Sequence, residues 1–125
     1  MSAAAYDVII VGAGIVGAAC AEECSRQGMR VAVADQEAVS GGATAALAFS
    51  RDPAQTFMFV VNQNNSRIDI VERQSGKVVS ALGQIGNLPG QFNQPHSVAV
   101  DSQNNLYVGE NRGRRIHKFT QKPTP

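Results

Sequence analysis

The sequence predicts a mixed fold in which one βαβ unit is followed by short antiparallel strands. A β-branched run at residues 8–11 leads directly into three glycines with the spacing G-x-G-x-x-G, as expected where a buried strand turns into a helix. From residue 46 onward, short candidate strands are separated by Asn, Gln, Gly and Pro, and two of these stretches repeat each other. All five prolines and every asparagine follow residue 45, so the composition changes where the pattern changes.

Chain length and charge are consistent with two segments joined near residue 45. A chain of 125 residues is long enough to bury one compact core. Residues 1–44 carry five acidic and two basic side chains, whereas residues 45–125 carry five acidic and nine basic ones, so the net charges are −3 and +4. We therefore predict two regions, residues 1–45 and residues 46–125, from separate architectures.

The first region is predicted to contain a strand, a helix and a second strand. Residues 7–11 are typical of a strand buried on both faces of a parallel sheet. The helix is predicted over residues 15–27, and Gly28 supplies the left-handed residue that often ends a helix. The second strand follows at residues 30–35.

The two cysteines, Cys20 and Cys24, are four residues apart and share one face of the predicted helix. This spacing is neither that of a zinc knuckle nor that of a redox C-x-x-C pair, so we predict small apolar side chains packed under the helix. The chain has no basic leader before its first apolar run and no apolar stretch of the roughly 18 residues that a spanning helix needs. These features predict a cytoplasmic protein with no membrane contact.

Each glycine of the G-x-G-x-x-G motif has a separate role in a Rossmann-like phosphate site. Gly12 permits the tight turn, Gly14 lets the backbone approach a pyrophosphate, and Gly17 lets the helix lie close to the strand. Asp35 ends the second strand, where a bound dinucleotide would place its ribose hydroxyls. The predicted phosphate donors are the amides at the helix N-terminus, including those of Ala13 and Ile15.

The segment YDVIIVGAGIVGAACAEECSRQGMRVAVADQEAVSGGATAA resembles the N-terminus of FAD-dependent amino-acid and amine oxidoreductases of the D-amino-acid oxidase type. The most specific part is the glycine motif combined with SGGATAA at residues 40–46. The resemblance implies FAD as the cofactor in preference to NAD, and it implies that the loop containing Ser40, Gly42 and Thr44 passes near the pyrophosphate. That family usually has Glu at the ribose position, where this chain has Asp35.

The resemblance to the oxidoreductases ends near residue 46. Such enzymes need further strands and a separate substrate domain, so we expect a fragment that holds the ADP moiety of FAD without a complete catalytic apparatus. We predict no catalytic residue and no metal ligand. Whether the chain acts as an enzyme is left open.

The second region is predicted to be a series of short strands that repeat. MFVVNQNNSRIDIV at residues 58–71 aligns without a gap with LYVGENRGRRIHKF at residues 106–119. The alignment pairs Arg67 with Arg115 and Phe59 with Tyr107. The predicted strands are Leu47–Ser50, Phe57–Asn62, Arg67–Glu72, Lys77–Leu82, Ser97–Asp101, Leu106–Glu110 and Arg115–Thr120.

The segment GQFNQPHSVAVDSQNNLYVGENRGRRIHKF, residues 90–119, resembles NHL-repeat β-propellers. Propeller repeats are roughly 40–50 residues long and contain four short strands. The resemblance implies one blade of four strands and three strands of the next, about one and three-quarter blades. Because a propeller needs at least about four blades to close its ring, most of the ring is missing.

Histidine and arginine residues of the second region suggest two further sites, and we favour neither. His96 lies in a Pro-His-Ser context that resembles a zinc ligand of peptidyl-amidating lyases, but catalytic zinc needs about three protein ligands, and His117 lies on a different strand. We therefore predict an ordinary polar residue on an inner strand. A basic cluster is predicted to be a solvated strand edge rather than a nucleic-acid site; it comprises Arg112, Arg114, Arg115 and Lys118.

Three hypotheses for function follow from the sequence. The first is an FAD-binding fragment of an oxidoreductase. The second is an NHL-type binding or scaffold module that associates with itself through unpaired strand edges. The third is a chimera, without enzymatic function, whose two fragments pack into one hybrid core. The sequence leaves open whether such a fusion is natural, designed or accidental.

Overall fold

The computed structural model describes residues 6–11, 15–34 and 44–122. The fold is mixed and consists mostly of antiparallel sheets with one short helix, in agreement with the predicted class. None of the described helices is long and apolar enough to cross a membrane. The elements are β1 (Val8–Val11), α1 (Ile15–Arg26), β2 (Val31–Ala34), β3 (Thr44–Phe49), β4 (Phe57–Asn62), β5 (Arg67–Glu72), β6 (Val78–Leu82), β7 (Pro95–Val100), β8 (Leu106–Glu110) and β9 (Ile116–Phe119).

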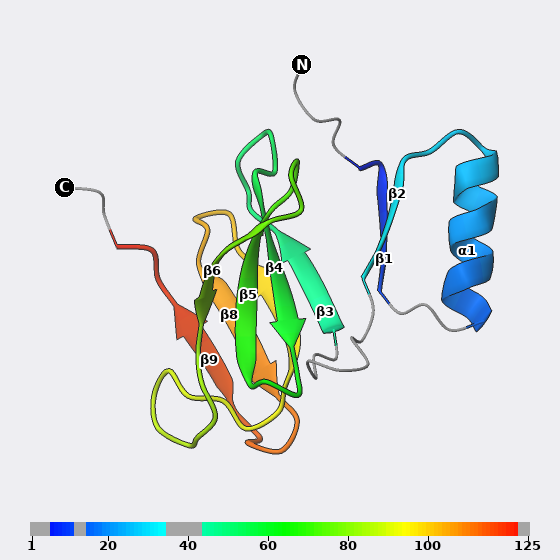
Figure 1. Cartoon of the computed structure of the whole chain (residues 1–125). Coiled ribbons are helices and arrows are strands. Elements are labelled where there is room, and N and C mark those ends of the chain that lie inside the picture. The colour runs from blue at the N-terminus through cyan, green and yellow to red at the C-terminus, as the bar shows by residue number, and fades with distance from the viewer. Residues whose placement is uncertain (1–5, 12–14, 35–43, 123–125) are drawn as a thin grey trace.

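The N-terminal elements form a parallel strand pair with α1 between the strands in sequence (Figure 1). Gly28 has a φ of 81° and ends the helix as predicted, and the amide of Met29 donates to the Cys24 carbonyl at 3.1 Å. Asp7 and Arg30 join the starts of the two strands through an ion pair of 2.8 Å. The Arg30 side chain and backbone amide, which both donate to this carboxylate, lower the pKa of Asp7 to about 2.

Two predictions about burial in this unit are wrong. β1 was expected to be buried on both faces, but its residues are only half-buried, and Val11 is exposed. Cys20 is also exposed, so it does not pack under α1. The common reason is that β1 and β2 form a sheet of only two strands, and this small sheet with one helix provides little surface to cover apolar side chains.

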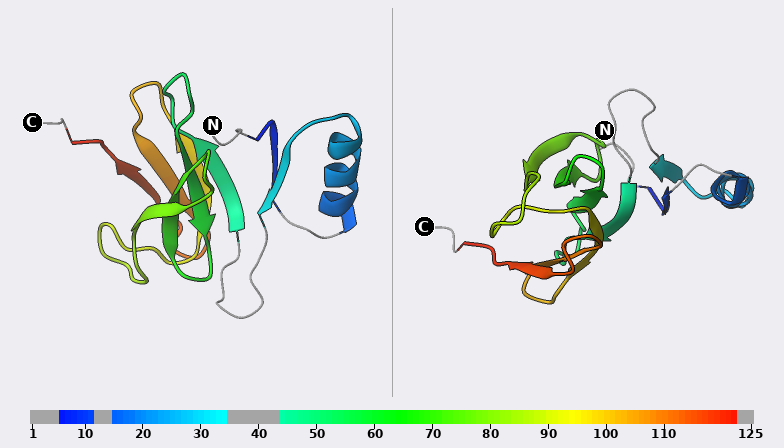
Figure 2. Two further views of the ribbon diagram at one scale, coloured as in Figure 1. Left: turned by 45° about the horizontal axis from the view of Figure 1, so that its top comes forward. Right: turned by 90° about the horizontal axis from the view of Figure 1, so that it is seen from below.

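The remaining strands form two antiparallel sheets in which neighbours along the chain pair with each other. The first has the order β3-β4-β5-β6 and the second has the order β7-β8-β9. Alternating side chains and polar turns predicted all seven strands, and the bounds of β4, β5 and β8 are those expected from the sequence. The two sheets lie against each other, with β3 and β4 next to β7 (Figure 2).

The core lies between these two sheets. It comprises Val61, Ile68, Phe92, Val100, Leu106 and Val108. No described residue of β1, α1 or β2 belongs to this cluster, so the expected hybrid core between the two segments is wrong. The N-terminal unit instead lies beside the edge strand β3 (Figure 1), and Arg73 donates to the Tyr6 carbonyl at 2.8 Å.

Phe92 fills the centre of the core from the loop that connects the two sheets. Its side chain is fully buried, and its backbone amide donates to the Gln84 carbonyl at 2.8 Å. The ring meets Phe119 edge-on at a centroid distance of 5.8 Å. Gly83 allows this packing, because a Cβ at that position would lie 2.2 Å from the Phe92 ring. The loop therefore fixes how the two sheets pack.

An aspartate holds the turn after the first strand of each sheet. In the second sheet, Asp101 accepts the backbone amides of Gln103 and Asn105, each at 2.9 Å, and also the Asn105 side-chain amide. In the first sheet, Asp52 accepts the amide and hydroxyl of Thr56 at 3.0 and 2.6 Å. Donors of this kind stabilise the ionised form, so both carboxyl groups have a pKa of about 2. The largest contribution comes from the Ser50 hydroxyl, which donates to Asp52, and from the Asn105 side chain at Asp101.

Replacing Asp101 with asparagine should change the pH dependence of the free energy of unfolding. Because the folded-state pKa lies below the ordinary value of 3.8, the ionised carboxylate stabilises the fold above about pH 4, and this contribution is lost as the pH falls towards 2. The stability difference between wild type and Asp101→Asn should therefore shrink between pH 4 and pH 2, as measured by urea unfolding. Glu22→Gln, on the exposed face of α1, serves as the control and should show a much smaller change.

Candidate functional site

Three of the predicted cofactor residues lie in described elements, namely Ile15, Gly17 and Thr44. Ile15 is the first residue of α1, and Gly17 lies in its first turn. Thr44 is the first residue of β3 and pairs with Asn62. The other predicted residues lie outside the described part of the chain; they are Gly12, Ala13, Gly14, Asp35, Ser40 and Gly42.

The register of β1 and β2 ends both strands at the same level. Val11 and Ala34 are paired, and each is the last residue of its strand. Gly12 follows the first and Asp35 follows the second in the sequence. α1 begins three residues after Gly12, and its first turn contains no acidic side chain that would offset the positive end of the helix dipole. The described elements are therefore compatible with a phosphate at the helix N-terminus and a ribose beside β2.

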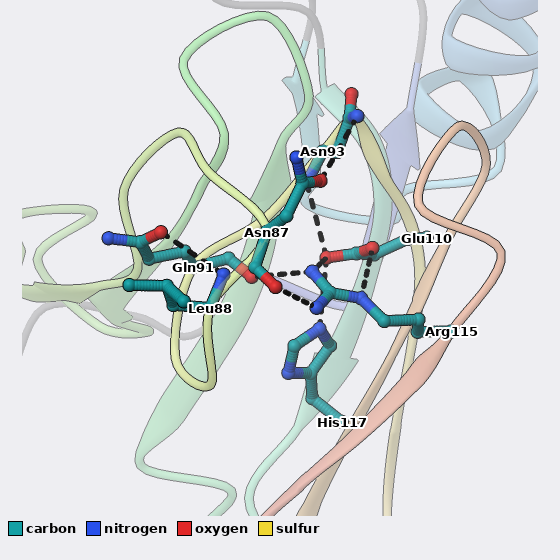
Figure 3. A network of polar contacts seen from close by, with 7 residues as sticks. All are labelled: Asn87, Leu88, Gln91, Asn93, Glu110, Arg115 and His117. Atoms are coloured by element: carbon teal, nitrogen blue, oxygen red, sulfur yellow. Dashed lines mark hydrogen bonds and ion pairs between the residues drawn. The ribbon is translucent and has the colours of Figure 1, made fainter.

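A second polar site, not expected from the sequence, is centred on Glu110 in the second sheet (Figure 3). Its side chain is fully buried and accepts Nε and Nη2 of Arg115 at 3.1 and 3.0 Å. The Asn93 amide donates to the same carboxylate at 3.1 Å, and His117 Nε2 lies 2.9 Å away. Gly113 packs so closely that a Cβ there would lie 1.4 Å from Glu110 Oε2.

Burial and hydrogen bonding act in opposite directions on Glu110. Burial raises the pKa of its carboxyl group, but donation from Arg115, Asn93 and His117 outweighs burial and leaves the pKa below its ordinary value of 4.5. Arg115 also donates to the backbone carbonyls of Asn87 and Gln91, which lie in the loop between β6 and β7 (Figure 3). The network therefore connects the second sheet to the loop that carries Phe92.

This network corrects the interpretation of the basic cluster. Arg115 was expected to be part of a solvated edge, but it is held by Glu110 and by two loop carbonyls. His117 is likewise mostly buried, whereas His96 is exposed on β7. Among the described residues, no group of three or more His, Cys, Asp or Glu side chains could hold a metal ion.

The internal repeat contained a signal for this network. In the first sheet Arg67 donates to Asp69 at 2.7 Å, and the Asn62 side chain donates to the same carboxylate at 3.0 Å. In the gapless repeat alignment, Asn62, Arg67 and Asp69 correspond to Glu110, Arg115 and His117. Polar residues aligned in both copies would have indicated a network of hydrogen bonds at equivalent positions of the two sheets.

Two of the hollows among the described residues border β8 and β9. One of about 440 Å³ is lined by residues of β7, β8 and the turn before β9, among them His96, Ser97, Arg114 and Ile116. The other, of about 650 Å³, lies between the two sheets and has a mostly apolar lining that includes Phe59, Val79, Leu106 and Phe119. Neither hollow is lined by a described residue of β1, α1 or β2.

Comparisons with known proteins address the two segments separately. No curated protein matches the chain. The solved structure of Kuenenia stuttgartiensis hydrazine synthase is similar with a TM-score of 0.50 and 20% identity over 65% of this chain, and the likeness is one of fold. This chain spans about 20% of the length of that protein's chain.

Two family models match the sequence. The NHL repeat matches residues 92–119, which contain β7, β8 and β9. The model described as FAD dependent oxidoreductase matches residues 7–97, more than half of the chain, and it continues past residue 46 through the antiparallel strands β3 to β6. Both resemblances predicted from the sequence are confirmed, and the chain belongs to the FAD dependent oxidoreductase family.

Proposed function

We propose that the β1-α1-β2 unit is a Rossmann-like element that binds the ADP moiety of FAD. The observation that supports this best is the parallel register of β1 and β2, which ends both strands at the same level, with α1 starting four residues after the end of β1. In this arrangement the helix N-terminus faces a phosphate, and the acid that follows β2 reaches the ribose. FAD is preferred over NAD because the family is FAD dependent.

Most of the residues proposed to hold the cofactor would do so through backbone amides or by leaving space for the pyrophosphate. The amides of Ala13 and Ile15 donate to the pyrophosphate, and Gly14 leaves room for its approach. Asp35 accepts the ribose hydroxyls. Ser40, Gly42 and Thr44 are proposed to border the pyrophosphate on the side of β3. When bound, the flavin ring of FAD supplies a two-electron acceptor; we propose no catalytic residue of this chain.

Titration of the full chain with FAD, ADP and NAD tests this proposal. We expect saturable binding of FAD and ADP and weaker binding of NAD, measured by equilibrium dialysis. Gly14→Ala should weaken binding of ADP by at least about tenfold, because a methyl group blocks the approach of the pyrophosphate. Gly76→Ala, in the β5–β6 turn, is a matched control: its φ is 70° and no atom would lie within 4 Å of the new Cβ.

The proposal fails if wild type binds neither FAD nor ADP at high micromolar concentration. Equal ADP affinity of Gly14→Ala and wild type would also contradict it. Thermal unfolding of both variants separates loss of the site from loss of the fold, because Gly76→Ala carries the cost of a methyl group at positive φ without touching the site.

A second candidate function is a binding or scaffold module built from the strands β3 to β9. We propose that these sheets are successive blades of a propeller-type repeat, which is supported by their shared strand order and by the core between them. Residues 1–45 and 46–125 would then be two joined fragments. The edge strand β6, whose Val78 and Val79 are 60% and 54% exposed, is the proposed site of self-association.

Sedimentation velocity distinguishes the scaffold candidate. Self-association through β6 predicts a concentration-dependent oligomer that Val79→Lys dissociates, because a charge on an exposed edge strand opposes pairing. A monomer at all concentrations would rule out this form of assembly while leaving the cofactor proposal untouched.

A further inference from the structure

Among the described strands, the second sheet has none at the position that β6 occupies in the first sheet. The repeat alignment pairs β9 with β5, and β5 is followed by β6, which runs antiparallel along its outer edge. β9 pairs with β8 on one side, and its other edge pairs with none of the described strands. Such an edge presents unpaired amide and carbonyl groups that can bind another strand.

An apolar cleft lies beside this edge. The hollow of about 650 Å³ between the sheets is lined by the paired residues Phe59 and Ile70 on one side and by the paired residues Leu106 and Phe119 on the other. Val79 of β6 also lines this cleft. Figure 1 shows β6 and β9 on the same side of the molecule. A strand added to β9 would direct every second side chain into this cleft.

The opposite face of β9 is basic. Arg112, Arg114 and Lys118 form no ion pair with any described residue, whereas the charge of Arg115 is offset by Glu110. Arg114 and Ile116 line the hollow of about 440 Å³ on this face, and Ile116 is 78% exposed. The side chains of an added strand that point away from the cleft would therefore lie next to positively charged residues.

Charge also decides between candidate occupants of the edge. If β9 paired with β9 of a second copy, Lys118 and the neighbouring arginines of one chain would lie against those of the other, and like charges on paired strands destabilise a sheet. An acidic strand experiences the opposite effect. The occupant favoured by the described residues is therefore an extended peptide with alternating apolar and acidic side chains.

We propose that the free edge of β9 binds such an acidic, amphipathic peptide by antiparallel strand addition. Its apolar side chains enter the cleft beside Phe119, and its acidic side chains lie opposite Lys118 and near Arg114. Main-chain hydrogen bonds to β9 supply affinity, and the two faces supply specificity. This binding site is separate from the proposed cofactor site, so each can fail without the other.

The test uses the full chain and a labelled, end-capped peptide, Val-Glu-Ile-Glu-Val-Glu-Ile-Glu, in fluorescence anisotropy at low salt. We expect saturable binding. Successive amides of a strand point to opposite sides, so N-methylation of one alternate set of residues should weaken binding at least about tenfold, while methylation of the other set changes it less than about twofold.

A charge swap tests the basic face. Lys118→Glu should weaken binding of the acidic peptide about threefold, and a peptide with lysine in place of the glutamates should bind this variant more tightly than it binds wild type. Lys77→Glu, just before β6 and outside this face, is the control and should leave the affinity unchanged. Exposed surface charges are suited to this test because their replacement seldom disturbs folding.

Three outcomes would overturn the proposal. They are no binding at about 1 mM peptide, equal effects of both N-methylated sets, and a dimer of the chain that Lys118→Glu stabilises and the peptide does not dissociate. The last result would assign the β9 edge to a second copy. Sedimentation of the chain with and without peptide provides that measurement.

Discussion

Replacing Phe92 with alanine should lower the free energy of unfolding by about 4 kcal/mol. The ring is fully buried between the two antiparallel sheets and contacts His117 and Phe119 edge-on. Its removal leaves a cavity that the two sheets cannot easily close, because the loop that carries Phe92 is also held by Arg115. Urea unfolding followed by circular dichroism measures this change through the midpoint and slope.

Two exposed residues of the same loop provide the control. Ile85 and Leu88 are 79% and 65% exposed, and their replacement by alanine should change stability by less than about 0.5 kcal/mol. A loss at Phe92 no larger than the losses at these positions would mean that the interface between the sheets does not carry the stability of this region.

The second large effect is expected at Glu110. Glu110→Gln keeps the size of the side chain but removes the charge that Arg115 and His117 contact, so it should cost about 3 kcal/mol. Because the folded-state pKa of Glu110 lies below 4.5, this stabilisation is present above about pH 4.5 and is lost as the pH falls below it. Wild type and variant should therefore become more similar in acid.

The matched control for Glu110 is Glu72, the last residue of β5. Its carboxylate accepts the hydroxyl of Ser75 in an exposed turn, so Glu72→Gln should cost well under 1 kcal/mol. If the two glutamine variants unfold at the same urea concentration, the buried network contributes no more than a surface hydrogen bond.

Much of the fold follows from local sequence patterns. Strands β4, β5 and β8 were predicted to the residue because alternation and turn residues act over a few positions, and Gly28 marked the end of α1 for the same reason. The half-buried state of β1 did not follow, because it depends on how many strands join the sheet. An apolar run looks the same in a sheet of two strands as in a sheet of six.

One of the two candidate sites could likewise be predicted from local sequence patterns, and the other could not. The glycine spacing predicted a strand, a helix and a parallel strand, and these elements are present in that order. Arg115 was misinterpreted because two of its partners, the Asn87 and Gln91 carbonyls, come from the β6–β7 loop, more than 20 residues away, and only Glu110 is near it in the sequence. The sequence shows that basic residues are clustered, but only the fold shows which acidic groups neutralise them.

The placement of the buried acids has a consequence for folding errors. The acid of the first sheet is Asp69 on β5, whereas that of the second sheet is Glu110 on β8, although the two sheets repeat each other. If β5 formed a mistaken pair with β8 in the equivalent register, two carboxylates would be buried side by side. If β4 paired with β9, the arginine would have no acid beside it. The two repeats have similar hydrophobic patterns, which alone would allow a strand of one sheet to pair with a strand of the other. Because the buried acid lies on a different strand in each repeat, such mistaken pairs are destabilised.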